Sequence, residues 1–384
     1  MKKKRVAVIV RSLKIGGMER VAVNLSEAFA EENWESHLIY FKDKNRAIEP
    51  NKDVFMHHFD LDKILNLTVI GVLLKLVAKF LNGIFRNSFF LYIGVLNTPI
   101  FRWKLQQIEK QYGKFDLIIM RGHGTFEEIW SYKDNRVVQM VESVFIRNEK
   151  FIDKLYIKCV YSGKNLAGVS SGVKDKIEEV LKITKTRAKS VNVIYNPLNI
   201  DNINKKADEY MPDIESDYIV SVGRITPNKN ISFLLEAYEY ARNHYNLTLP
   251  LVIIGDGHDM VNVRKKITDL SLEEYVILKG LLINPYPWIK YSSCLTSTSY
   301  AEGFGMVLLE ALACHTKVIA TKSRGGVQEI MTGNLTKYLI DFNTKTFAKK
   351  MCEVILEKSE WDFENHIQKF KGKEIVKRYE ELYL

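Results

Sequence analysis

Cysteine is scarce in this sequence, and no two cysteines form a motif. The four cysteines, Cys159, Cys294, Cys314 and Cys352, lie far apart, with no CxxC pair and no histidine pairing nearby. This spacing excludes a disulfide framework and a Cys/His metal site, and it favours reduced thiols in a cytoplasmic protein.

The sequence also lacks a long uncharged apolar run. A membrane-spanning helix needs about 20 mostly apolar residues, and the longest uncharged piece of the most apolar region, residues 87–101, is shorter than that. The basic start Met1–Arg5 is followed only by the apolar run Val6–Val10, which is too short for the core of a signal peptide. We therefore expect the protein to stay in the cytoplasm.

Motifs for binding nucleic acid are absent as well. There is no zinc-finger spacing and no aromatic RNA-binding run, so nucleic acid is the least supported partner. The 56 Lys and Arg residues outnumber the 46 Asp and Glu residues, which gives a net charge of +10. This excess favours anionic partners such as phosphates or an acidic membrane surface.

Buried-strand patterns alternate with helical patterns along most of the chain. The run Val6–Val10 precedes the glycine pair Gly16-Gly17 and a helical pattern over Glu19–Ala30, which is the opening of a nucleotide-binding α/β unit. Further strands are expected over residues 37–41, 117–120, 137–141, 165–170, 191–195, 219–222, 251–254, 276–278, 294–296 and 317–320, and further helices over 232–242, 259–270 and 307–313. The length of 384 residues suits two domains. We expect an α/β protein with two Rossmann-like, doubly wound parallel-sheet domains and a ligand cleft between them.

The proposed domain boundary follows Pro197. Pro197 disfavours helix at Asn196 and stiffens the chain there. We expect a first domain over residues 1–197, a second over 198–365, and a C-terminal helix over 366–384 that packs back on the first domain. The polar stretch Asn199–Ser216 is expected to be the hinge.

One basic, apolar stretch departs from the alternating pattern. No acidic residue occurs from Lys63 to Lys104, and Lys75, Lys79 and Arg86 interrupt its apolar background, which excludes a spanning helix. We interpret residues 63–104 as a surface that lies in the headgroup region of an anionic membrane leaflet. The alternative is a pair of core helices whose lysines reach solvent.

The residues best suited to chemistry run from Ser299 to Ala313. Gly303 and Gly305 let backbone amides approach a ligand closely, and the start of the following helix offers free N–H donors to an anion. A carboxylate such as Glu310 accepts hydrogen bonds only, which suits it to a ribose diol. Surface carboxylates are the alternative, but the loop and helix around Glu302 and Glu310 disfavour it.

Two cations follow the first strand of the second domain. Arg224 comes directly after Val222-Gly223, and Lys229 follows after Pro227-Asn228. Past a strand end these side chains are well placed to neutralise a diphosphate, Arg224 bidentately and Lys229 as a point charge. Solvated loop charges are the alternative.

The order of these motifs resembles glycosyltransferase family 4. The other matching motifs are Gly255-Asp256-Gly257, Asn284-Pro285-Tyr286-Pro287 and Gly325-Gly326-Val327-Gln328-Glu329. The resemblance covers nearly the whole chain and is strongest over residues 218–332. It implies the GT-B fold, with an acceptor-binding first domain and a nucleotide-sugar-binding second domain.

The resemblance also implies roles for individual residues. Glu302 would lie by the donor sugar, Glu310 would hold the ribose, and Gly17 would lie near the phosphates. The full donor-binding set is Gly17, Arg224, Lys229, Glu302, Gly303, Phe304, Gly305 and Glu310. The catalytic set is Arg224, Lys229, Glu302 and His123, which follows the strand at 117–120 between Gly122 and Gly124. Glu142, after the strand at 137–141, is the candidate for acceptor binding.

The implied reaction moves a sugar from a nucleotide sugar, expected to be a UDP-sugar, to a lipid-linked or polysaccharide acceptor in bacterial surface-glycan synthesis. No nucleophile in the first domain supports a double displacement. We therefore expect front-face substitution with retention, at the inner face of the cytoplasmic membrane, without a cofactor or metal ion. Asp60-Leu61-Asp62 matches a metal motif of the other major glycosyltransferase fold, but it does not end a clear strand.

Three alternatives remain open at this point. A sugar-nucleotide 2-epimerase shares the two-domain fold. An NAD-dependent oxidoreductase suits a strand-glycine-helix opening, although Gly16-Gly17 is not a GxGxxG motif. A non-catalytic membrane-binding module is the third alternative. The sequence also departs from the family at His315, which stands where the family has a glycine turn, and at Lys317, which replaces a proline.

Overall fold

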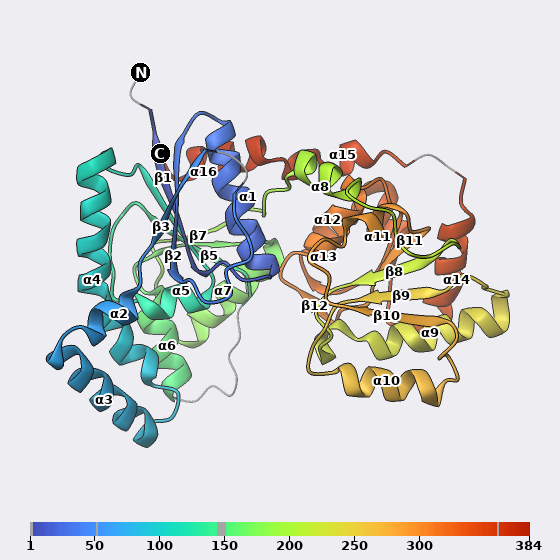
Figure 1. The fold of residues 1–384 in the computed structure, drawn as a ribbon, viewed down its shortest axis with the longest axis horizontal. Coiled ribbons are helices and arrows are strands. Elements are labelled where there is room, and N and C mark those ends of the chain that lie inside the picture. Colours follow the sequence, from blue (N-terminus) through green and yellow to red (C-terminus); the bar gives the residue numbers. More distant parts are fainter. Residues whose placement is uncertain (1–2, 51–52, 144–150, 359–360) are drawn as a thin grey trace. The chain divides into compact units, whose positions relative to one another are not determined.

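The computed structural model describes residues 3–50, 53–143, 151–358 and 361–384. The chain divides into two compact units (Figure 1). Unit 1 combines the chain up to Pro197 with Gly372–Leu384, and unit 2 is Leu198–Lys371. Each unit is described by itself.

Unit 1 is built on a parallel sheet with strand order β3-β2-β1-β4-β5-β6-β7. The strands are β1 (Arg5–Ser12), β2 (Glu35–Lys42), β3 (Val54–His58), β4 (Leu117–Arg121), β5 (Val137–Val141), β6 (Asn165–Gly168) and β7 (Ser190–Val193). Every residue from Val6 to Val10 is fully buried because helices cover both faces of the central strand. These helices include α1 (Gly17–Glu31), α5 (His123–Glu128), α6 (Phe151–Tyr161) and α7 (Ser171–Ile183).

The last helix of the chain, α16 (Gly372–Tyr383), belongs to unit 1 and packs on α1. The Tyr379 ring lies 5.7 Å from the Phe29 ring, and both side chains are fully buried. A Cβ at Gly372 would lie 2.7 Å from the Ala28 Cβ, so glycine permits the close approach of the two helices. The C-terminal helix expected over 366–384 is therefore shorter, because α15 (Phe363–Ile367) and the 3₁₀ turn Gln368–Phe370 belong to unit 2.

Residues 61–112 of unit 1 form α2 (Leu61–Asn66), α3 (Val69–Ile84) and α4 (Phe89–Tyr112). Helix α4 buries Phe90, Phe101 and Leu105, as a core helix would. Helix α3 instead lies at the periphery of unit 1 (Figure 1) and leaves most of its apolar side chains exposed. No helix in the described part of the chain has the length and apolar character needed to cross a bilayer.

Unit 2 is built on a second parallel sheet, with strand order β10-β9-β8-β11-β13-β15. The strands are β8 (Ile219–Val222), β9 (Leu251–Ile254), β10 (Val276–Gly280), β11 (Cys294–Ser297), β13 (Val318–Thr321) and β15 (Leu339–Ile340). The main helices are α8 (Ile200–Ala207), α9 (Ile231–Tyr245), α10 (Met260–Asp269), α11 (Tyr286–Lys290), α12 (Met306–Ala313), α13 (Val327–Ile330) and α14 (Thr344–Leu356). A small parallel pair, β12 (Ala301–Glu302) and β14 (Arg324–Gly325), lies outside this sheet. The predicted α/β class with two Rossmann-like parallel-sheet units is confirmed.

The expected hinge over Asn199–Ser216 is not an irregular linker. Its first part is helix α8, which Asn199 caps by accepting a hydrogen bond from the Asn202 N–H. Ile203 and Ala207 of this helix are buried in unit 2. The stretch looked polar because only one face of a short helix is buried.

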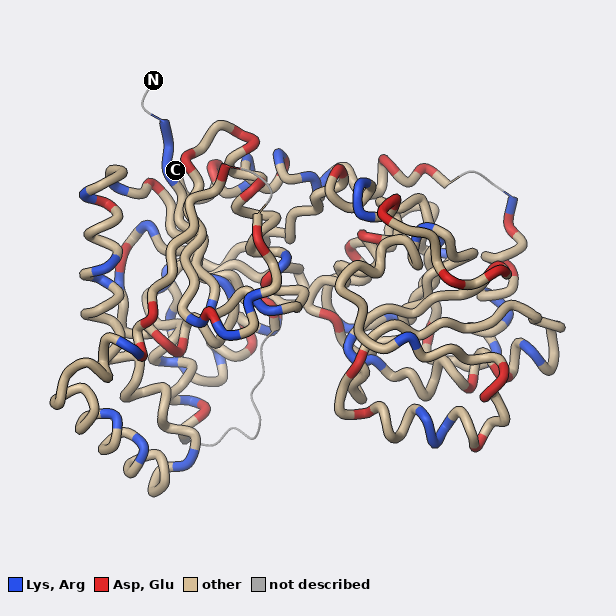
Figure 2. The backbone as a smooth tube through the Cα atoms, viewed as in Figure 1, with Lys and Arg blue, Asp and Glu red and all other residues tan. Residues whose placement is uncertain are grey.

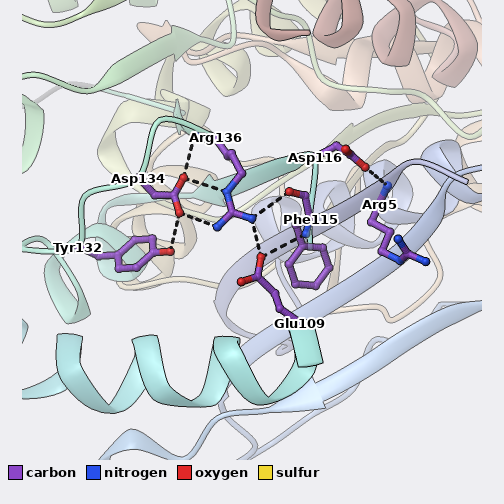
Figure 3. A network of polar contacts seen from close by, with 7 residues as sticks. All are labelled: Arg5, Glu109, Phe115, Asp116, Tyr132, Asp134 and Arg136. Atoms are coloured by element: carbon purple, nitrogen blue, oxygen red, sulfur yellow. Dashed lines mark hydrogen bonds and ion pairs between the residues drawn. The ribbon is translucent and has the colours of Figure 1, made fainter. Parts of the chain in front are cut away.

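A network of ion pairs fixes the amino-terminal ends of the strands in unit 1 (Figure 3). The Arg136 guanidinium, just before β5, donates to Asp134 at 2.6 Å and to Glu109 at 2.5 Å. It also donates to the Phe115 carbonyl at 2.9 Å. Arg136 therefore joins the end of α4 to the start of β4 and β5 by hydrogen bonds.

Candidate active site

The carboxyl ends of β8 and β9 in unit 2 touch through glycines. Gly223 follows β8 with φ +156° and Gly255 follows β9 with φ +145°. A Cβ at Gly255 would lie 1.8 Å from the Gly223 carbonyl oxygen, so only glycine fits at this position. This contact fixes the loop that carries Arg224, whose side chain is exposed at the end of β8.

Lys229 and Glu302, which the sequence assigns to the phosphates and the sugar, form an ion pair in unit 2. Lys229 lies in a 3₁₀ turn after β8, and Glu302 lies in β12 after β11. The Ser299 hydroxyl donates to the same Glu302 oxygen at 2.6 Å. Sequence analysis did not single out Ser299 for this role. A carboxylate held by both an ammonium group and a hydroxyl has a fixed orientation before any substrate binds.

The Glu302 loop is supported from behind by the glycine pair Gly325-Gly326. Strand β14 pairs with β12, so that Gly325 is opposite Glu302. A Cβ at Gly325 would lie 1.7 Å from the Glu302 carbonyl oxygen, and a Cβ at Gly326 would lie 2.7 Å from the Phe304 Cα. The glycine motif therefore allows two backbones to run in contact.

Helix α12 carries Glu310 and begins at Gly305, whose φ is +102°. The Glu310 side chain is buried, and the Tyr286 hydroxyl donates to its Oε1 at 3.3 Å. Tyr286 belongs to the Asn284–Pro287 motif, which the sequence linked only to the family. The Phe304 side chain is also buried, where it packs 5.3 Å from the Phe370 ring. Only the backbone of Phe304 is therefore left to contact a donor.

The turn after α12 has the geometry that a glycine would normally supply. His315 has φ +59°, in the left-handed region, and its ring packs 5.2 Å from Phe363. Lys317 donates to the Val354 carbonyl at 3.1 Å, which holds the turn against α14. Burial raises the pKa of Cys314, next to this turn, to about 12, so its thiol stays protonated.

In unit 1, the first loop touches the loop that carries His123. A Cβ at Gly122 would lie 2.1 Å from the Met18 sulfur, and Gly122 has φ +76°. A Cβ at Gly17 would meet no atom within 4 Å, so the space beside this glycine is open. Glycine at position 122 therefore lets the start of α1 pack against the carboxyl end of β4.

Both ring nitrogens of His123 have partners within unit 1. Nε2 lies 2.5 Å from the Ser143 carbonyl oxygen, which can only accept, and Nδ1 lies 3.0 Å from the Tyr156 hydroxyl. The neutral ring therefore carries its proton on Nε2 and accepts from Tyr156 at Nδ1. His123 is fixed in orientation at the carboxyl end of β4.

Glu142 follows β5 and pairs with Arg121, the last residue of β4. The Arg121 guanidinium is fully buried, and it also donates to the Asn196 side-chain oxygen at 2.6 Å. Sequence reasoning missed both partners, because 21 and 75 residues separate them from Arg121. An arginine beside the predicted His123 was the one available signal.

The aspartates of the Asp60-Leu61-Asp62 motif have structural partners. Asp60 caps α2 by accepting from the Lys63 N–H at 2.9 Å, and Asp62 pairs with Lys75 at 2.9 Å. In the described part of the chain, no three His, Cys, Asp or Glu side chains gather in an arrangement that could hold a metal ion.

Comparison with known proteins identifies the family. Residues 202–370, which make up nearly all of unit 2, match the family model "Glycosyl transferases group 1". This part of the chain is a group 1 glycosyltransferase domain. The resemblance found in the motifs is thus confirmed, and the enzyme class is a glycosyltransferase rather than an oxidoreductase or a non-catalytic module.

Relatives of this glycosyltransferase include a Campylobacter jejuni enzyme over nearly its whole length. That enzyme is named N-acetylgalactosamine-N,N'-diacetylbacillosaminyl-diphospho-undecaprenol 4-alpha-N-acetylgalactosaminyltransferase. It is 25% identical over 92% of this chain and 90% of its own. A Staphylococcus aureus poly(ribitol-phosphate) alpha-N-acetylglucosaminyltransferase is 26% identical over 54% of this chain and 44% of its own.

Solved glycosyltransferase structures share the fold of the whole chain. The structure of S. aureus TarM in complex with UDP and alpha-GlcNAc-glycerol has a TM-score of 0.70 at 16% identity, and it covers 99% of each chain. The likeness shows that this glycosyltransferase has the GT-B fold.

Proposed function

We propose that this glycosyltransferase moves a sugar, with retention, from a UDP-sugar to a polyprenyl-diphosphate-linked glycan. The reaction would take place at the inner face of the bacterial cytoplasmic membrane, in surface-glycan synthesis. The observation that carries the proposal is the Lys229–Glu302 ion pair beside the exposed Arg224. It places two cations and one oriented carboxylate at the carboxyl edge of a parallel sheet, where such folds bind ligands.

The donor site would work mainly by positioning and charge. Arg224 and Lys229 would offset the charge of the departing diphosphate, and the N-terminus of α12 would add N–H donors. As the bond between the anomeric carbon and the β-phosphate oxygen breaks, the acceptor oxygen bonds to that carbon from the same face. The acceptor proton passes to the departing phosphate oxygen. Glu302, held by Ser299, would contact the transferred sugar.

The ribose would be held by Glu310, with Tyr286 orienting the carboxylate. The buried position of Glu310 favours this role over that of a surface charge, because a buried carboxylate must be paired or hydrogen-bonded. A carboxylate that accepts from Tyr286 can accept from ribose hydroxyls as well.

The acceptor would be bound by unit 1. Glu142 and His123 lie at the carboxyl ends of neighbouring strands. The relatives support a surface-glycan acceptor, since one is named for a diphospho-undecaprenol substrate and another for poly(ribitol-phosphate). Both names specify alpha linkages, which retention gives from an alpha-linked nucleotide sugar.

Helix α3 supports a membrane contact, because its amphipathic character is inverted. The residues that are buried or half-buried recur at helical spacing, and all but Leu81 are small or polar: Gly71, Lys75, Ala78, Leu81 and Asn82. The opposite face is apolar and exposed, with Leu73 56% and Phe80 69% accessible to solvent. A face of this kind lowers its free energy by entering the headgroup region of a bilayer.

The charges around α3 favour an anionic leaflet. Only basic charged residues occur along α3 (Figure 2), and Lys79 in the helix and Arg86 just after it are both exposed. Lys75 has a different role, because it turns inward and pairs with Asp62 at 2.9 Å. The alternative of core helices describes α4 but not α3.

The donor site is tested by thermal shift and hydrolysis with a panel of UDP- and GDP-sugars, without added metal. We expect one UDP-sugar to stabilise the wild type and to lose that effect in Glu310→Ala. The control is Glu236→Ala, which removes a half-exposed carboxylate from α9. A response to NAD alone, or epimerisation of the nucleotide sugar without an acceptor, would overturn the proposal.

The acceptor is tested by transfer from the responding UDP-sugar to three probes. These are a synthetic polyprenyl-diphosphate N-acetylhexosamine, the free N-acetylhexosamine, and poly(ribitol phosphate). Transfer to the polyprenyl compound alone, with the anomeric configuration of the donor kept in the product, supports the proposal. Transfer only to either of the other two probes, or inversion at the anomeric carbon, contradicts it.

A further inference from the structure

The Arg121 guanidinium is a buried cation with few partners. It is fully buried at the end of β4, where its Nη2 donates to Glu142 Oε1 and to Asn196 Oδ1. Its Nε and Nη1 have no hydrogen-bond partner among the described residues. Removing a charged group from water is costly, so a single carboxylate partner must supply most of the compensation.

Glu142 is pinned by this contact on the acceptor side of unit 1. The Glu142 side chain is 22% exposed, while that of Arg121 is not exposed at all. The buried guanidinium therefore holds a carboxylate that reaches the surface. The other carboxylate oxygen lies 3.5 Å from the Asn196 side-chain nitrogen. The residue after Glu142 supplies the carbonyl that holds His123. Arg121 thereby sets the position of both predicted acceptor-side groups.

The same guanidinium donates to the segment through which unit 1 continues into unit 2. Asn196 precedes Pro197, the last residue of the first segment of unit 1. One buried side chain thus bonds to both the acceptor-side carboxylate and the start of the linker.

We propose that Arg121 is a positioning residue for the acceptor, which it serves by fixing the Glu142 carboxylate and tying it to Asn196, next to the chain crossing at Pro197. Glu142 then accepts hydrogen bonds from hydroxyl groups of the acceptor glycan in one defined orientation. The proposal rests on the proposed glycosyl transfer and adds a residue with no direct contact to substrate. A merely structural ion pair would affect stability but not acceptor recognition.

Arg136 provides a matched control in the same unit. Like Arg121, it is an arginine in a carboxylate network, but it is only partly buried. Its partners are Asp134 and Glu109 (Figure 3). Arg136 precedes β5, whereas Arg121 ends β4. Because the two strands are parallel neighbours, the two networks lie at opposite ends of the strands. Loss of Arg136 should destabilise unit 1 without changing the acceptor site.

The kinetic test compares Arg121→Met, Arg121→Lys, Glu142→Gln and the double variant Arg121→Met/Glu142→Gln with Arg136→Met. The substrates are the responding UDP-sugar and the polyprenyl-diphosphate N-acetylhexosamine probe. We expect Arg121→Met and Glu142→Gln each to raise the acceptor KM about tenfold or more. The donor KM and donor hydrolysis should stay within about twofold, because the charged donor-binding side chains belong to unit 2. The double variant should be no worse than the worse single variant, because both changes remove one interaction.

Arg121→Lys should recover part of the acceptor KM, since lysine keeps the charge but loses the planar fork. If Arg121→Met does not fold, the Arg121→Lys and Glu142→Gln variants carry the same comparison. The proposal fails if the two single effects multiply in the double variant. It also fails if Arg121→Met and Arg136→Met change the same kinetic parameters.

A measurement without acceptor separates this proposal from the proposed function. Hydrogen exchange should rise together at residues 140–143 and 194–199 in Arg121→Met, and it should not rise there in Arg136→Met. If the wild type transfers sugar to none of the acceptor probes but this exchange pattern appears, the acceptor assignment is wrong, while the Arg121 hydrogen-bond network is supported. If exchange rises only within β4, Arg121 does not tie these segments together and the proposal is refuted.

Discussion

The apolar face of α3 gives the sharpest quantitative prediction. Leu73 and Phe80 are seven residues apart on one side of the helix, opposite the face that packs on the protein. Full burial of such a side chain is worth about 1.5–3 kcal/mol. With Leu73 56% and Phe80 69% exposed, the area still open to burial is worth about 1 and about 1.5 kcal/mol respectively.

We therefore expect the double variant Leu73→Gln/Phe80→Gln to bind vesicles containing anionic phosphatidylglycerol more weakly than the wild type. The sum of about 2.5 kcal/mol corresponds to a loss of about 60-fold in the partition coefficient, and burial of half that area to about tenfold. Vesicle flotation over a range of lipid concentrations measures this directly. The melting temperature should not fall, because exposed side chains contribute little to folding stability.

Val261→Gln is the matched control for this experiment. Val261 is 78% exposed on α10 of unit 2, so the variant also removes exposed apolar surface, but from another place. Vesicle binding by Val261→Gln should equal that of the wild type. The reasoning is refuted if Leu73→Gln/Phe80→Gln binds like the wild type, or if the variant unfolds more easily. A dimer that this variant converts to a monomer would show that a second copy covers α3 instead.

Three further predictions concern the donor site and the edge of unit 1. Gly325→Ala should reduce donor-dependent turnover by about 100-fold or more, because its Cβ would collide with the Glu302 carbonyl oxygen at 1.7 Å. Gly83→Ala, whose Cβ would meet nothing within 4 Å, is the control, and a similar loss in both variants would contradict the steric argument. Lys229→Met should weaken UDP binding by about tenfold or more in a calorimetric titration, through loss of the diphosphate contact, and unchanged affinity would remove Lys229 from the donor site. The pKa of His57 is lowered from 6.5 to about 4, mainly by burial and to a smaller extent by the charge of a second histidine. Between these two pKa values, the His57 ring is protonated more readily in the unfolded chain than in the folded one. The unfolding free energy should therefore fall by at most about 3 kcal/mol as the pH is lowered from 6.5 to 4, and this group should not affect it above pH 6.5. Urea titrations at several pH values measure the slope, and His57→Phe should flatten it.

Much of the fold follows from patterns that are local in sequence. A continuous β-branched run such as Val6–Val10 can be recognised as a buried parallel strand without knowledge of its neighbours. The Glu302 loop was recognisable for the same reason, because its glycines and the following helix lie within a dozen residues. Strand β3 has a mixed, half-exposed pattern, and this edge strand was missed.

The rest depends on contacts between distant residues or on which face of a helix is buried. The apolar composition of α3 was visible, but its inward face is defined by Gly71 and Ala78, which carry no strong hydrophobic signal. The pairing of Arg121 with Glu142 requires β4 and β5 to be neighbours in the sheet. Phe304 likewise looked like a loop residue at the donor until Phe370, from a distant segment, was seen to cover it.

The return of α16 to unit 1 affects the order in which the two units can finish folding during synthesis on the ribosome. Unit 2 is continuous in sequence and has all its strands once Lys371 has been made. Unit 1 begins first, but the face of α1 that carries Phe29 stays uncovered until Tyr379 has been made, after all of unit 2. Domains fold as units as they leave the ribosome. Unit 1 therefore lacks its last helix while the whole of unit 2 is synthesised. The two units therefore finish folding in the reverse of the order in which they begin.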